Sequence, residues 1–238
     1  MDNQADPQVV LIPRDSSQAS TLDSTAKAFR KLRLQGLQTE PASFSSSYST
    51  ESQRPPSFWT KRLQDPQART FALIHTDPGA QCPQDSEPAP DRPWTGMLVL
   101  LGPKVIDPNA YDNSSSWREI LPESSSKFDD PEQKEAGTEF SSVRSALAYH
   151  VVAVYLVPEV RGKGLAKRLM SSAFISIKQD VKNMGYGQAI CTVGVAKGVI
   201  AARKTYASMG FVDVAEDHYT TDDGRTFHDS VMRRDLTL

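Results

Sequence analysis

Apolar positions in the second half of the chain predict a strand followed by a helix. Residues Tyr149–Leu156 are almost all apolar, which is typical of a strand buried on both faces of a sheet. After Arg161, apolar residues recur at every fourth position, so they fall along one stripe of an amphipathic helix. The stripe is expected to hold Leu165, Leu169, Ala173, Ile177 and Val181.

Similar patterns predict further elements on both sides of this pair. Ser-rich Ser43–Pro56 is expected to be a loop, and Ser57–Leu63 fits either a short helix or a loop held by aromatic residues. With that helix counted, the predicted order is β-α-α-β-β-β-α-β-α-β-β. The other strands are expected at Val9–Pro13, Arg69–His75, Trp94–Leu101, Gln188–Val195, Phe211–Ala215 and Phe227–Arg233, and the other helices at Ser20–Gln38 and Gly198–Met209.

Two segments lack such a pattern and are expected to be loop insertions in one domain spanning residues 1–238. Residues 77–93 are rich in proline, and residues 102–148 contain two serine triplets and a surplus of acidic side chains. Both are expected to be partly disordered or to form a lid. As a lid, the acidic segment would favour a cationic substrate, and as a spacer it would have no part in catalysis.

Composition narrows the class of protein. The formal net charge of −2 gives no basic surplus, so a nucleic-acid partner is not expected. No apolar run approaches the roughly 20 residues that span a bilayer, so no membrane partner is expected. Cys82 and Cys191 have neither disulfide nor metal-ligand spacing, so we expect no metal site. A reducing compartment fits this usage, which points to the cytoplasm, with the nucleus as the alternative.

The turn between the predicted strand and helix is the most specific feature. Gly162 and Gly164 allow successive backbone N–H groups to approach an anion, and the start of the following helix adds further donors. The turn has neither a third glycine at Rossmann spacing nor the Gly-Lys-Ser/Thr of a P-loop. It therefore predicts a pyrophosphate site of another kind.

Two motifs resemble the GNAT superfamily of acyl-CoA-dependent N-acetyltransferases. They are the run Arg161-Gly-Lys-Gly-Leu-Ala166 and the later Tyr206-Ala-Ser-Met-Gly-Phe211. The resemblance implies an α+β, three-layer fold, in which a mixed, mostly antiparallel central sheet with a splayed central strand pair is flanked by helices. It also implies acetyl-CoA as co-substrate and no metal.

The resemblance places the cofactor on particular residues. It implies that the pantetheine arm pairs with the backbone of Leu156 and Val157, and that Ala202 and Tyr206 complete the site. Val199 stands where the family often has an asparagine that helps bind pantetheine. The pyrophosphate is expected on the backbone amides of Val160, Arg161, Gly162, Lys163, Gly164, Leu165 and Ala166.

The resemblance also suggests catalytic roles. Tyr206 looks like the family's general acid, which returns a proton to the departing thiolate; the alternative is that it is a core aromatic residue. His150 is the leading candidate for the general base, and the alternative is a structural histidine beside an apolar strand. Glu119, Glu139 or a water chain could replace it in that role, while His218 and His228 are further candidates near the terminal strands.

These features predict a transferase that moves an acetyl group from acetyl-CoA to a primary amine. Direct attack in a ternary complex with a small-molecule amine is the leading hypothesis. One alternative is a non-catalytic acyl-CoA-binding or regulatory domain. Another is a protein or peptide N-acetyltransferase that needs a partner. Terminal edge strands often pair between copies, so a homodimer is compatible with the pattern.

Overall fold

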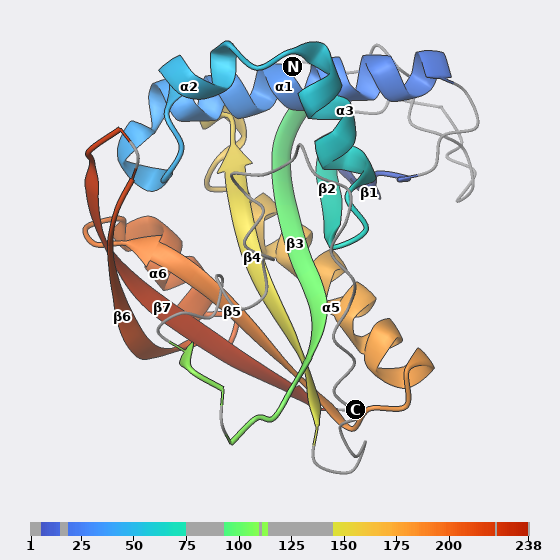
Figure 1. Ribbon diagram of the computed structural model, residues 1–238, viewed down its shortest axis with the longest axis vertical. Coiled ribbons are helices and arrows are strands. Elements are labelled where there is room, and N and C mark those ends of the chain that lie inside the picture. Colours follow the sequence, from blue (N-terminus) through green and yellow to red (C-terminus); the bar gives the residue numbers. More distant parts are fainter. Residues whose placement is uncertain are drawn as a thin grey trace. The chain divides into compact units, whose positions relative to one another are not determined.

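The computed structural model describes residues 6–14, 19–74, 93–109, 111–113, 145–221 and 223–237. Within them, seven strands form one sheet in the order β1-β2-β3-β4-β5-β7-β6 (Figure 1). The strands are β1 (Gln8–Leu11), β2 (Ala68–Ile74), β3 (Trp94–Ile106), β4 (Ala146–Leu156), β5 (Gln188–Ala196), β6 (Val212–Thr220) and β7 (Thr226–Thr237). The α-helices are α1 (Ala19–Thr39), α2 (Tyr48–Ser52), α3 (Pro56–Gln64), α5 (Leu165–Asn183) and α6 (Ile200–Ala207), and two 3₁₀ turns are η1 (Pro41–Ser43) and η5 (Pro158–Val160).

Strand pairing confirms the predicted sheet. β1 runs antiparallel to β2, and β5 runs antiparallel to β7. β4 and β5 are parallel, and their ladder runs from Leu147 opposite Ala189 to Val151 opposite Val193. Both strands continue beyond this last pair, which agrees with the predicted splayed central strands.

The predicted strand and helix around residue 160 are also confirmed. β4 is fully buried over its first six residues, as expected from its apolar run. All five residues of the predicted helical stripe in α5 are at most 3% exposed. Gly210, directly after the predicted helix Gly198–Met209, has φ +85, a left-handed conformation that glycine adopts without strain.

The prediction of a loop across residues 43–56 was wrong, because a short helix forms there. The Ser47 hydroxyl accepts a hydrogen bond from the Thr50 amide at 3.2 Å and so caps the start of α2. The following segment takes the helical alternative and forms α3. Figure 1 shows α2 and α3 lying against α1.

The predicted bounds of the acidic insertion were too wide at both ends. β3 continues to Ile106 and β4 already begins at Ala146, because pairing with neighbouring strands carries both strands beyond their apolar runs. Residues 75–92, 110 and 114–144 lie outside the described residues, and they include most of the predicted lid at 102–148 and most of the Pro-rich segment at 77–93.

The chain clusters into two compact units that alternate along the sequence. The first comprises residues 1–100, 152–173 and 220–227, and the second comprises residues 101–151, 174–219 and 228–238. In the first unit, Phe29 packs against Trp59 and Trp94 with ring centroids 5.9 and 6.1 Å apart. In the second unit, the core includes Leu147, Tyr149, Ile177, Val193 and Met232.

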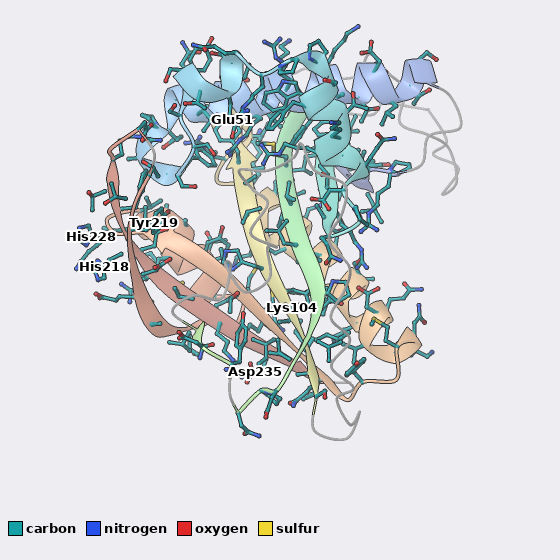
Figure 2. The ribbon with its side chains drawn as sticks, in the orientation of Figure 1. Glu51, Lys104, His218, Tyr219, His228 and Asp235 are labelled. Atoms are coloured by element: carbon teal, nitrogen blue, oxygen red, sulfur yellow. The ribbon has the colours of Figure 1, made fainter. Side chains whose placement is uncertain are left out.

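A buried ion cluster joins the helices of the first unit. Arg33 on α1 donates two hydrogen bonds, of 2.8 and 3.0 Å, to the carboxylate of Glu51 on α2, and Arg62 on α3 lies 3.4 Å from the same carboxylate. Figure 2 labels Glu51 among these helices. Burial alone raises the pKa of Glu51, but the two arginines outweigh it and lower this pKa to about 2.

Replacing Glu51 by glutamine is expected to destabilise the protein by about 3 kcal/mol at pH 7, because Arg33 is left buried without its counter-ion. Glu51 contributes stability above its ordinary pKa of 4.5, and this is lost as the pH falls toward 2. Urea unfolding at pH 7 and at pH 3 measures both effects. Asp23→Asn, which breaks the exposed pair with Lys27, is the control and should change stability by less than about 1 kcal/mol. An equal decrease in the free energy of unfolding in the two variants would contradict the conclusion that burial makes the Glu51 ion pair important.

Candidate functional site

The predicted pyrophosphate loop lies in the first unit, between the end of β4 and the start of α5. Val160 and Leu165 are buried and anchor the loop at its two ends. The residues between them are exposed. Gly162 and Gly164 have φ values of +77 and +74, and no atom lies within 4 Å of where a side chain would begin. Glycine is therefore required here for its backbone conformation and not for space.

Backbone donors of the loop divide into two groups. The amides of Val160 and Arg161 already donate to the carbonyls of Val157 and Pro158 in the 3₁₀ turn. Among the described residues, the amides of residues 162–164 donate to no acceptor. The first helical bond of α5 runs from the Arg168 amide to the Gly164 carbonyl, so the amides of residues 165–167 also lack a helical acceptor. Left-handed glycines that alternate with another residue are typical of the backbone pattern called an anion-binding nest.

Backbone groups expected to pair with pantetheine have protein partners in this structure. The Leu156 carbonyl accepts a hydrogen bond of 3.0 Å from Nε of Arg161, and the Val157 amide donates to the Thr95 carbonyl at 2.9 Å. The Arg161 guanidinium also lies 2.7 Å from the carboxylate of Glu40. A carbonyl oxygen has two lone pairs, so the Leu156 carbonyl can accept a second hydrogen bond from a ligand, whereas the single N–H of Val157 is already used.

Ala153 gives β4 an unusual backbone just before the loop. Its φ of +53 is the only positive value among the non-glycine residues that the structure describes. Alanine in this conformation is strained by about 1 kcal/mol or more, and such strain clusters at functional sites. No sequence signal identified this position, because nothing in an apolar strand marks an alanine as left-handed.

Tyr206 lies in the second unit, on the last turn of α6. The residue is 6% exposed, and its ring packs against Phe211 with centroids 5.8 Å apart. Burial raises the pKa of the phenol, and nearby Cys191 raises it further, so the group keeps its proton at neutral pH. The hydroxyl makes no hydrogen bond to another described residue, and its proton is therefore available.

His150 also lies in the second unit, on β4. Its Nδ1 is 2.8 Å from the Thr192 hydroxyl, which itself donates to the Tyr149 carbonyl at 3.2 Å. Because that hydroxyl uses its proton on the carbonyl, it accepts from the His150 Nδ1–H, and the ring lone pair is left on Nε2. Burial lowers the pKa of His150 to about 4, although Asp217 opposes this, so the ring is neutral at pH 7.

His150→Gln is expected to lower kcat by about 100-fold or more if the histidine accepts the amine proton, with little change in acetyl-CoA affinity. Only the neutral ring can accept a proton, so the activity should fall at low pH as His150 becomes protonated. Because the pKa of His150 is lowered, this fall is expected near pH 4 instead of near 6.5. A pH profile of kcat/KM from pH 4 to 9 measures this. Thr192→Val, which removes only the partner of Nδ1, is the control. A wild-type limb near pH 6.5 that is retained in His150→Gln would contradict the assignment.

A carboxyl cluster in the second unit was missed by sequence reasoning. Asp217 on β6 is buried, and Asp229 on β7 accepts a hydrogen bond from the Tyr219 hydroxyl at 3.1 Å. Burial raises the pKa of Asp229, Asp217 raises it further, and Tyr219 opposes both. Its Oδ1 is buried and accepts no hydrogen bond from the described residues. The only available signal was a pair of aspartates in two terminal strands, which resembles ordinary surface charge.

The remaining predicted residues have less distinctive surroundings. Ala202 is half-buried on α6, and Val199 precedes that helix without a capping side chain. Glu119 and Glu139 lie outside the described residues. In the part of the chain that the structure describes, no three His, Cys, Asp or Glu side chains converge to hold a metal ion, and no helix is long and apolar enough to cross a membrane.

Residues 115–233, half of the chain, match the family model of the acetyltransferase (GNAT) domain. The chain belongs to the GNAT acetyltransferase family. The matched range contains both the glycine loop and Tyr206, which confirms the resemblance that those motifs suggested. A search of curated proteins finds no match to the chain.

Several solved structures share the fold of this chain. An N-acetyltransferase from Staphylococcus aureus Mu50 is 11% identical, with a TM-score of 0.54 over 98% of this chain and 100% of its own. The putative acetyltransferase yncA from Salmonella typhimurium, solved with its cofactor acetyl-CoA, is 12% identical, with a TM-score of 0.53 over 98% and 95%. Arabidopsis thaliana NAA60 in complex with acetyl-CoA is 13% identical, with a TM-score of 0.50 over 97% and 98%.

Proposed function

We propose that this GNAT protein is an N-acetyltransferase that moves an acetyl group from acetyl-CoA to a primary amine of a small molecule. The observation that carries the proposal is the glycine loop, with its run of unengaged amides at the start of α5. Acetyl-CoA, which is bound to yncA and to NAA60 in their solved structures, has the pyrophosphate that such a nest fits. It supplies the activated acetyl group.

Side chains of the second unit supply the proton chemistry of this proposal. Nε2 of His150 accepts the proton that an ammonium acceptor must lose before it can attack. The new C–N bond then forms as the C–S bond of the thioester breaks, and the Tyr206 hydroxyl gives its proton to the thiolate. The two states are compatible, because the histidine is neutral and the phenol protonated over the same pH range.

The acceptor that we propose is a cationic amine. Asp217 and Asp229 place carboxyl groups in the same unit as His150 and Tyr206, and a positively charged ligand beside a buried carboxyl group favours its ionised form. The single cysteine in the described core, Cys191, is a free thiol, which supports the cytoplasm as the compartment of this reaction.

Free-thiol release from acetyl-CoA tests the proposal. The protein is presented with polyamines, arylamines, amino acids, aminoglycosides and basic peptides, and products are identified by mass spectrometry. Acceptor-dependent thiol release with an acetylated amine supports the proposal, and preference for a basic peptide would move the acceptor from a small molecule to a protein. Absence of acetyl-CoA binding by calorimetry would overturn it.

A non-catalytic acyl-CoA-binding domain is the second candidate, and Val199 favours it. This residue stands where many family members have an asparagine that contacts pantetheine. Binding without turnover for every acceptor would support the second candidate. Val199→Asn should then tighten acetyl-CoA binding. Acceptor-dependent turnover gained by this variant would instead support the N-acetyltransferase and contradict the second candidate.

A further inference from the structure

Two histidines form a pair on the β6–β7 hairpin. Nδ1 of His218 on β6 and Nδ1 of His228 on β7 are 2.6 Å apart, and the two rings meet edge to face with centroids 4.5 Å apart. Figure 2 shows the two labelled side chains next to each other, pointing away from the ribbon. Two imidazole nitrogens therefore converge on one point outside the sheet.

The proton positions in this pair are compatible with binding of a cation between the two Nδ1 atoms. Two Nδ1 atoms can share one proton only when one ring donates and the other accepts. Nε2 of His218 lies 3.5 Å from the carboxylate of Glu216, which favours the proton on Nε2 and the lone pair on Nδ1. The proton between the two Nδ1 atoms then belongs to His228, and when a metal ion binds both nitrogens, His228 takes its other tautomer, with the proton on Nε2.

The pair is open to solvent and separate from the carboxyl cluster. Glu216, His218 and His228 are exposed, whereas Asp217 between the first two is buried. Alternate residues of a strand point to opposite faces, so the histidines occupy the face of the hairpin opposite Asp217. A ligand can reach them without rearrangement of the core.

We propose that His218 and His228 bind a divalent transition-metal ion through their Nδ1 atoms, with Glu216 orienting His218 from behind. Imidazole suits copper, nickel and zinc, and a carboxylate on the second ring nitrogen is the common arrangement around metal-bound histidine. Metal–nitrogen distances of about 2.0–2.1 Å require the two nitrogens to separate slightly from 2.6 Å, which a small rotation of exposed rings provides.

The proposed site has two protein ligands, so water completes the coordination sphere. Structural metal sites usually have four protein ligands. With only two protein ligands, the ion is expected to exchange with ions in solution. The ion has no part in the proposed acetyl transfer. For sites built from imidazole, the order of affinity expected is copper above nickel and zinc.

Isothermal titration of the chelator-treated full chain with CuCl₂, NiCl₂ and ZnCl₂ tests the site. One saturable site per chain is expected, and the Cu²⁺ form should show nitrogen hyperfine coupling from two imidazoles by electron paramagnetic resonance. His218→Ala and His228→Ala should each lose this site. Glu216→Gln should bind about tenfold more weakly, because only the orienting carboxylate is removed.

Ser230→Ala is the matched control, since Ser230 lies two residues from His228 on the same face of β7. It should bind the metal as the wild type does. Unchanged melting temperatures show that each variant folds. Equal metal affinity in wild type and His228→Ala, or the absence of saturable binding, would overturn the site and leave the pair as a hydrogen bond alone. Because the readout is metal binding, neither result depends on the proposed acetyl transfer.

Discussion

Gly164→Val is expected to abolish acetyl-CoA binding. Gly164 has φ +74, and a β-branched residue can relieve the resulting strain of about 1–3 kcal/mol only by turning the peptide away. That turn removes the loop amides from the anion. Loss of two hydrogen bonds to a charged group, at about 1.5–3 kcal/mol each, lowers affinity by about 100-fold or more. Calorimetric titration with acetyl-CoA measures the loss.

Gly185→Val is a closely matched control for this variant. Gly185 also has φ +74 and open space around the position of a side chain, but it follows the end of α5 instead of preceding its start. The two variants should therefore lose similar conformational stability, while only Gly164→Val loses the cofactor. Tight acetyl-CoA binding by Gly164→Val would exclude the loop as the pyrophosphate site.

Tyr206→Phe is expected to lower kcat by about 100-fold or more and to leave acetyl-CoA affinity nearly unchanged. The substitution removes one oxygen and keeps the ring that packs against Phe211. Because the raised pKa keeps the phenol protonated, wild-type activity should not decline up to pH 9 through ionisation of Tyr206. Thiol release under saturating acceptor measures kcat.

Tyr186→Phe is the control for the loss of a phenol. Tyr186 follows α5 and is half-buried, so its hydroxyl can be removed without touching the aromatic contacts of α6. It should keep wild-type turnover. If the kcat of Tyr206→Phe equalled that of this control, Tyr206 would not be the general acid. It would then be a buried aromatic residue with a structural role only.

Periodicity predicted the elements that bury a continuous apolar face. α5 is the clearest case, since its stripe from Leu165 to Val181 needs only local spacing to be recognised. α2 could not be predicted in this way, because its five residues owe their helix to the Ser47 cap and to Arg33, which is distant in sequence. Strand ends were similarly hidden, because pairing partners decide how far β3 and β4 continue.

Candidate chemistry was predictable where it depends on the backbone of a short motif. Gly162 and Gly164 predicted a loop with accessible backbone amides, and the structure has such a loop, while its binding of an anion stays a prediction. The pairing of Arg161 with the Leu156 carbonyl and with Glu40 was not predictable, because it depends on how the end of α1 meets the loop. Asp229 escaped notice for the same reason, since its raised pKa comes from burial and from Asp217 across the hairpin.

The buried thiol of Cys191 can serve as a probe of local unfolding. Burial raises the pKa of this thiol to about 12, and only a thiolate reacts with alkylating reagents, so the folded chain protects it. In a variant with Cys82 replaced by serine, alkylation of Cys191 would require β5 to open. The rate of labelling then reports the free energy of that opening, without a dye or a denaturant.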